Sequence, residues 1–227
     1  MLLAEDLLLL LTDDSSGRAA LDGTRLDLAL AGAVVLELAT AGRVVVSEPG
    51  GAVRPGRLVV RDPSPTGDGV LDEALRRIGT RRPGKPQDHL PGLAKQLRPG
   101  LLDRLVGRGI LRAEQGRVLG IFPTRSWPAV DSAHERDVRR GLVEVLALGR
   151  TPTPREAALV SLLGAVDQVP RVMAGSGLDK RELRRRARAI AAGEFAGEAV
   201  RKAVAAVTAA TSAAVTAATS AAVVAGS

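Results

Sequence analysis

Basic side chains gather just ahead of a predicted helix start, and they are the residues in this sequence best suited to bind an anion. Arg98 directly precedes Pro99, a residue that favours the first turn of a helix, and Lys95 lies three residues before Arg98. Unpaired backbone N–H groups at a helix N-terminus attract anions, and arginine can hold a phosphate with two parallel hydrogen bonds. Arg81 and Arg82 in the preceding segment widen this surface. The pattern predicts an anion-binding site, and the alternative is a solvated basic face in which Arg98 pairs with a local carboxylate.

Catalytic patterns are missing, so we expect no enzymatic activity. The complete motifs GxSxG and GxxxxGK[ST] do not occur. Adjacent carboxylates such as Glu5 and Asp6 do not face one another on a helix, so we interpret them as a solvated face rather than an acid/base pair. Cysteine is absent, and His89 and His134 are far apart in sequence. We therefore expect neither a metal site nor a cofactor.

Composition narrows the class of partner. The 227 residues carry a formal net charge of +7, which favours anionic partners such as lipid headgroups, nucleic acid or acidic proteins. Aromatic residues make up only 1% of the chain, so base stacking on aromatic platforms is nearly excluded. We expect no nucleic-acid partner. A winged-helix arrangement of residues 99–108 with the following hairpin is the DNA-binding alternative.

The elements that must position these side chains are mostly helices in a single domain. Apolar residues recur at helical spacing from Leu26 to Leu38, and Gly42 follows where a helix C-cap favours glycine. Short β-branched runs at 44–46 and 58–60 predict a small strand pair. The segment from Thr80 to Pro91 is basic and proline-rich, and it predicts a loop. Further helices are predicted near residues 69–78, 99–108, 132–148 and 152–169. Two more are predicted to start at residues 180 and 198.

The two ends of the chain are apolar. Residues 7–11 are too short to cross a bilayer, and Glu5 and Asp6 stand where a signal peptide carries basic residues. Residues 203–225 are uncharged and long enough to cross, but alanine and threonine contribute little to insertion. The octet AAVTAATS occurs twice in succession, at 205–212 and 213–220. We expect a domain over 1–209 and a repetitive Ala/Thr/Ser-rich tail over 210–227, helical or disordered and outside the core.

A predicted hairpin over 111–125 could serve binding. Its apolar residues Val118, Leu119, Ile121 and Phe122 could insert among lipid headgroups or pack against another copy of the chain. The alternative is that one face of the hairpin packs on its own domain.

Three segments in order resemble the Golgi phosphoprotein 3 family, whose bacterial relatives are common in actinobacteria. The first is the leucine run at 6–12 followed by GAVVLELATAGRV at 32–44. The second is PTGDGVLDEALRRI at 65–78, and the third is LLDRLVGRGILRAEQGRVLGIFPTRSWP at 101–128. The resemblance covers about Leu2 to Ala209. It implies a mainly α, single-domain fold with a projecting β-hairpin and minor short strands.

The resemblance also implies a function. Eukaryotic members are peripheral membrane proteins that bind phosphatidylinositol 4-phosphate and connect the membrane to enzyme tails. The arginine pair of their headgroup site carries over onto Lys95 and Arg98, whereas the family's tryptophan falls near Asp22 and its other arginine near Ala31, and these do not match.

We therefore expect a cytoplasmic protein, peripheral on the inner face of the cell membrane, that binds anionic, phosphoinositide-like headgroups through a basic pocket and acts as an adaptor. The alternative is a protein–protein interaction module that oligomerises through the hairpin and has no lipid role.

Overall fold

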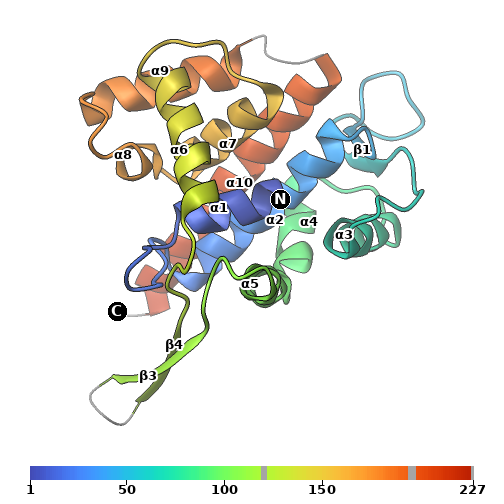
Figure 1. Ribbon diagram of the computed structural model, residues 1–227. Coiled ribbons are helices and arrows are strands. Elements are labelled where there is room, and N and C mark those ends of the chain that lie inside the picture. Colours follow the sequence, from blue (N-terminus) through green and yellow to red (C-terminus); the bar gives the residue numbers. More distant parts are fainter. Residues whose placement is uncertain (119–121, 194–197, 226–227) are drawn as a thin grey trace.

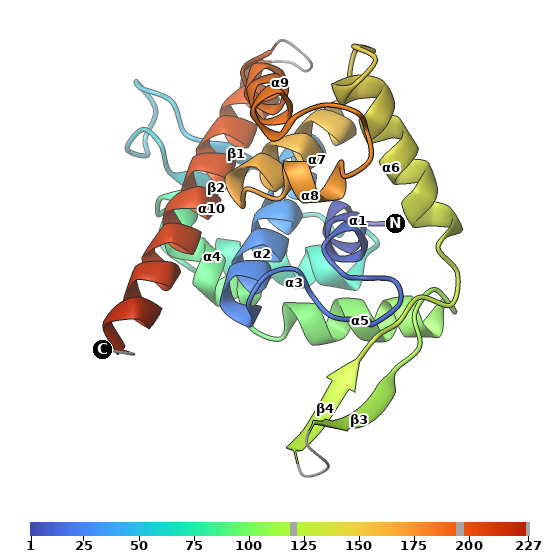
Figure 2. The same cartoon turned by 90° about the vertical axis from the view of Figure 1, so that its left-hand side faces the viewer.

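Two apolar helices form the centre of the computed structural model, which describes residues 1–118, 122–193 and 198–225. Every residue of α1 (Leu3–Leu10) is buried, as are most residues of α2 (Gly23–Thr40). Asp22 caps α2 by accepting a hydrogen bond of 3.0 Å from the backbone N–H of Arg25. The other helices surround this pair (Figures 1 and 2). A helix that is apolar on all sides belongs in the interior, so the sequence itself places α2 at the centre.

The described residues confirm a mainly α fold with two antiparallel strand pairs. The first pair is β1 (Val44–Val46) with β2 (Leu58–Val60), and the second is β3 (Glu114–Val118) with β4 (Phe122–Ser126). The surrounding helices are α3 (Gly69–Gly79), α4 (Pro86–Ala94), α5 (Leu97–Gly107), α6 (Ala133–Leu146), α7 (Pro154–Ala165), α8 (Val169–Val172), α9 (Lys180–Ala192) and α10 (Glu198–Ala225).

Helix α4 is a departure from the sequence-based expectation, which placed a loop over most of it. Pro86 occupies the first turn, where its missing N–H costs nothing, and Asp88 accepts a hydrogen bond of 2.9 Å from the backbone N–H of Lys85. Pro91 lies inside the helix, where proline usually breaks the hydrogen-bond pattern. The buried side chains of Leu90 and Leu93 pack into the core and offset that loss.

Helix α10 runs without a break through the expected boundary between residues 209 and 210. Ala210, Thr211 and Val215 beyond that boundary are buried, so this part of the repeat packs against the rest of the fold. Helix α10 crosses α2 at close range, because a Cβ added to Gly32 of α2 would lie 2.5 Å from the Oγ1 atom of Thr211 of α10. Among the described helices, Arg201–Ala221 alone is long and apolar enough for a membrane span by length and composition, and 33% of its most apolar window is buried in the fold.

The buried start of the chain corrects one sequence-based interpretation. Glu5 is fully buried and Asp6 is 3% exposed, so they do not form a solvated face. Glu5 accepts hydrogen bonds from Arg104 Nε at 2.9 Å and Arg108 Nη1 at 3.1 Å. Asp6 lies 2.8 Å from both Arg155 Nη2 and His134 Nε2. Buried carboxylates persist only when paired, and here they tie α1 to three other helices.

The β3–β4 hairpin extends away from the helices in both views (Figures 1 and 2). Its strands pair from Glu114↔Ser126 to Val118↔Phe122. Just after β4, the backbone N–H of Trp127 donates to the Gly17 carbonyl at 3.3 Å, which fixes the hairpin base to the loop after α1. Leu119 and Ile121, expected to contact membrane or a second copy, lie outside the described residues.

Candidate functional site

Side chains of α3, α4 and the loop between them line a cavity of about 290 Å³, which we call the cationic pocket. Three basic side chains and a histidine contribute to it, and the full lining is Arg77, Thr80, Arg81, His89, Gly92, Leu93 and Lys95. The structure thus brings together two of the residues predicted from sequence, Arg81 and Lys95.

Local sequence explains how the two helices present these groups. Asp68 starts α3 by accepting hydrogen bonds from the backbone N–H groups of Val70 at 2.9 Å and Leu71 at 3.5 Å. Helix α4 ends at Ala94 with Lys95 as its C-cap, and Gln96 adopts a left-handed backbone with φ of 62° before α5 begins. This tight turn leaves Lys95 exposed at the corner between α4 and α5.

Arg77 has a mainly structural task. Its Nη1 atom donates to the carbonyl oxygens of Gly92 at 3.0 Å and Lys95 at 3.1 Å, which are unpaired groups at the end of α4. Its Nε atom donates to Glu73 at 2.7 Å. Hydrogen bonds from Arg76 and Arg77 lower the pKa of Glu73 to about 2. Arg77 therefore joins α3 to α4 and has its charge balanced by Glu73.

Arg81 and Lys95 differ from Arg77 because both side chains are exposed and form no ion pair within the part of the chain that the structure describes. The guanidinium of Arg81 lies over Gly92, since a Cβ added there would be 3.0 Å from Arg81 Nη1. Two uncompensated cations at one small cavity favour an anion.

His89 forms part of the wall of the pocket. It is only 2% exposed, and neither ring nitrogen has a hydrogen-bond partner among the described residues. Burial lowers the pKa of His89, and the nearby Arg81 charge lowers it further, while Asp88 opposes both. The ring is thus neutral near pH 7 and keeps one N–H donor and one acceptor nitrogen for a ligand. A buried polar group without a partner is uncommon and is expected where a ligand or water completes it.

Arg98 and Arg82 are not part of this lining. Arg98 Nε lies 3.1 Å from Asp27 Oδ1, and both side chains are about one-third exposed. Burial raises the pKa of Asp27, and the Arg98 charge opposes that rise. Arg98 thus has the local carboxylate partner that the sequence left open as an alternative. Arg82 is exposed on the loop beside the pocket.

The two remaining positions carried over from the family resemblance contribute neither an aromatic ring nor a cation. Asp22 is exposed and caps α2, and Ala31 is fully buried within the same helix. The space beside Arg98 is therefore built differently from the site that the resemblance implies.

Other basic side chains are engaged within the fold. Arg184 donates to Asp167 at 2.7 Å and 2.9 Å, and Arg186 donates to the Leu146 and Ala147 carbonyls at the end of α6. Arg184 and Arg186 of the basic helix α9 are thus partnered within the fold. Within the described residues, no cluster of three or more histidine and acidic side chains could hold a metal ion.

Sequence reasoning missed His89 and Arg77 as members of the pocket. His89 had been considered only as a metal ligand, although it lies eight residues after Arg81 on the neighbouring helix. Arg77 and Arg81 are four residues apart, a spacing that favours the same face of a helix. Helix α3 ends at Gly79, so Arg81 lies in the turn directly after it.

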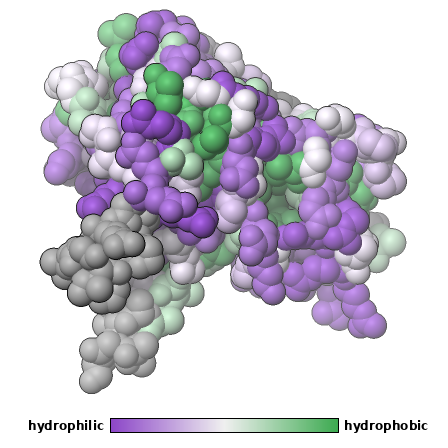
Figure 3. Space-filling model, turned by 60° about the horizontal axis from the view of Figure 1, so that its bottom comes forward, coloured by the Kyte–Doolittle hydropathy of each residue, from purple (hydrophilic) through white to green (hydrophobic). Residues whose placement is uncertain are grey.

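The face toward which the hairpin points is largely hydrophilic, with small apolar patches between the polar side chains (Figure 3). A surface of this kind suits electrostatic contact better than deep insertion.

Comparisons with known proteins agree with the order of the sequence motifs. The family model described as Golgi phosphoprotein 3 (GPP34) matches residues 3–207. Vacuolar protein sorting-associated protein 74 of Eremothecium gossypii is 29% identical over 161 residues, which cover 63% of this chain. The match covers 48% of that relative, so the chain spans about half the length of the curated protein. Because the family model covers most of the sequence, this chain belongs to the Golgi phosphoprotein 3 (GPP34) family.

Proposed function

We propose that this protein binds anionic, phosphoinositide-like lipid headgroups at a membrane surface through the cationic pocket, and that it acts as a non-enzymatic adaptor there. The observation that carries the proposal is the convergence of Arg81, Lys95 and the unpartnered His89 on one cavity. Membership of the Golgi phosphoprotein 3 family supports a lipid-associated adaptor role. We propose a cytoplasmic protein that is peripheral on the inner face of the cell membrane.

The pocket fits a phosphorylated headgroup better than a large apolar ligand. Its volume of about 290 Å³ is at the lower limit for small-molecule sites. Arg81 can offer two parallel hydrogen bonds to one phosphate, while Lys95 adds a point charge. The neutral imidazole of His89 can donate a hydrogen bond to a phosphate or sugar oxygen. Arg82 and Arg98 remain outlying candidates that attract the membrane without lining the pocket.

The test is sedimentation with vesicles of neutral phosphatidylcholine, alone or mixed with phosphatidylserine or a phosphorylated inositol lipid. Each cation near an anionic leaflet contributes about 1 kcal/mol, so reversing one charge should cost about 2 kcal/mol, or roughly 30-fold in affinity. We expect this loss for Arg81→Glu and for Lys95→Glu with the inositol lipid.

Arg82→Glu is the matched control because it makes the same change of charge on the neighbouring residue, outside the lining. On phosphatidylserine vesicles the two variants should lose similar affinity, because both reverse a charge near the leaflet. On vesicles with the inositol lipid Arg81→Glu should lose more, because only Arg81 also gives up direct hydrogen bonds to the headgroup phosphate. Equal losses for both variants on the inositol lipid, or no preference of the wild type for anionic vesicles, would refute the pocket as the binding site.

A second candidate function is self-association or partner binding through the hairpin, without a lipid role. The extension of β3 and β4 away from the helices favours it (Figure 1). Replacing residues 114–126 by a short glycine-rich linker tests this candidate. A fall in mass measured by light scattering supports it, and an unchanged mass counts against it.

A further inference from the structure

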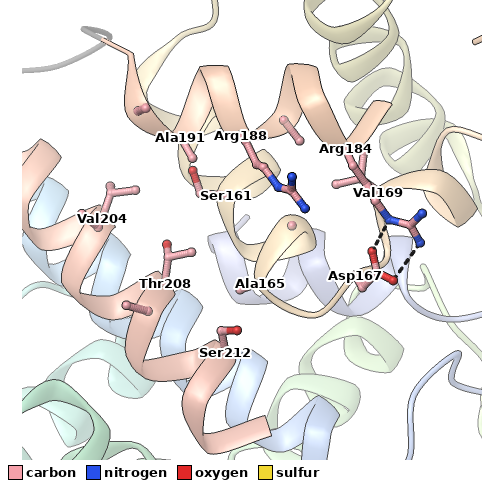
Figure 4. A pocket seen from close by; sticks show the side chains of 15 residues that line it. Ser161, Ala165, Asp167, Val169, Arg184, Arg188, Ala191, Val204, Thr208 and Ser212 are labelled. Atoms are coloured by element: carbon pink, nitrogen blue, oxygen red, sulfur yellow. Dashed lines mark hydrogen bonds and ion pairs between the residues drawn. The ribbon is translucent and has the colours of Figure 1, made fainter. Parts of the chain in front are cut away.

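A second cavity, of about 480 Å³, lies between α7, α9 and α10, on elements separate from those of the cationic pocket. Alanine and valine side chains of these helices supply most of its wall, and Figure 4 shows several of them pointing inward. We call it the alanine-lined cavity. Its volume lies within the usual range for small-molecule sites, and an apolar wall favours an apolar ligand.

The charges at this cavity do not cancel. Asp167 is the only carboxylate among its described lining residues, and Arg184 holds both of its oxygens, at 2.7 Å and 2.9 Å. Arg188 lies one helical turn further along α9, and its guanidinium is directed toward the cavity (Figure 4). Within the described residues Arg188 forms no hydrogen bond or ion pair, although its charge also acts on Asp167. Two arginines thus face one carboxylate, and the apolar cavity carries a net positive charge at its edge.

The wall supplied by α10 holds a further incomplete group. The Oγ1 atom of Thr208 is shielded from solvent and has no hydrogen-bond partner among the described residues. Ser161, by contrast, donates its hydroxyl to the Ala157 carbonyl at 2.7 Å. A buried hydroxyl without a partner is rare in folded proteins, and an alkyl chain cannot supply one, so a water beside the ligand would complete the Thr208 hydroxyl.

We propose that the alanine-lined cavity binds a single-chain anionic amphiphile, a fatty-acyl carboxylate, with the carboxylate at Arg188 and the alkyl chain against α7 and α10. One apolar cavity matches one alkyl chain, and one free guanidinium matches one carboxylate. The proposal is independent of the headgroup function, because none of its residues lines the cationic pocket.

The experiment measures binding of straight-chain carboxylates of increasing length to the full chain by calorimetry, below their micelle concentrations. Burying a methylene should tighten binding about fourfold until the cavity is full. Decanol, which has no charge, should bind at least about tenfold more weakly than decanoate. Arg188→Ala should remove that difference while leaving decanol binding unchanged.

Arg185→Ala is the matched control, because Arg185 is on the same helix, is exposed and does not line the cavity. Ala191→Phe, which fills the cavity from α9, should abolish binding of both decanoate and decanol. Lys95→Glu should leave decanoate binding intact, which separates this site from the headgroup site. Absence of saturable binding, equal affinity for decanol and decanoate, or equal losses for Arg188→Ala and Arg185→Ala would overturn the proposal.

Discussion

Glu135 on α6 makes the stability of this fold depend on pH in an unusual direction. The side chain is 6% exposed, and Arg139 donates a hydrogen bond to it. Burial, together with a hydrogen bond shared with the carboxyl group of Asp14, raises the pKa of Glu135 from 4.5 to about 7. The pairing with Arg139 opposes that rise without cancelling it.

The sign of the effect follows from the direction of this pKa shift. Between about pH 4.5 and pH 7 the unfolded chain releases the Glu135 proton while the folded protein retains it. The folded state therefore loses stability as the pH rises through this window. At about 1.4 kcal/mol for each pKa unit, the loss reaches about 3 kcal/mol above pH 7.

Glu135→Gln tests this reasoning because glutamine has the shape of the protonated acid and does not ionise. In urea denaturation the variant and the wild type should have similar unfolding free energies at about pH 5. At about pH 8 the variant should be more stable by up to about 3 kcal/mol. His89 contributes a pH dependence of opposite sign to both proteins, since its pKa is lowered in the folded state, and this contribution cancels in the comparison.

Asp137→Asn, a change at an exposed carboxylate on the same helix, is the control and should alter stability little at either pH. If the wild type and Glu135→Gln differ by the same amount at both pH values, Glu135 is ionised in the folded state and the reasoning is wrong.

Two further changes probe the packing of the core. Gly32→Ala should destabilise the fold by about 1–3 kcal/mol in thermal unfolding, because the new Cβ meets Thr211 Oγ1 at 2.5 Å. The double variant Gly32→Ala/Thr211→Ala should recover stability. A single variant as stable as the wild type would show that α2 and α10 do not cross so closely. Asp6→Ala should lower the free energy of unfolding by about 2–4 kcal/mol, because it removes the buried partner of Arg155 and His134. A decrease below about 1 kcal/mol would show that Asp6 is exposed to solvent.

The sequence predicted the fold class and most helices because their signals are local. The cap at Asp68, the glycine after α2 and the apolar spacing within α2 each act within a few residues. Helix α4 was missed because its two prolines and basic neighbours are typical of loops, while the buried Leu90 and Leu93 that stabilise it act through tertiary packing. The burial of Glu5 and Asp6 was also missed, since their partners lie about 100 residues or more away.

The candidate site was only partly accessible to sequence reasoning. Charge clustering suggested Arg81 and Lys95, and the structure places both at one cavity. Composition could not show that Arg98 pairs with Asp27 or that His89 turns inward without a partner, because both depend on how α2, α4 and α5 pack. The alanine-lined cavity could not be predicted from sequence. Alanine-rich helices can pack closely or leave a cavity between them, and their composition is the same in both cases.

The most direct test of headgroup binding observes the imidazole of His89. The chain contains only two histidines, and His134 lies beside Asp6, so it serves as an internal control. In a ¹⁵N NMR titration with a water-soluble inositol phosphate, the ring nitrogens of His89 should shift saturably while those of His134 stay in place, and Lys95→Glu should weaken the response. An unmoved His89 under conditions in which the protein binds vesicles that contain the phosphorylated inositol lipid would contradict the cationic pocket as the headgroup site.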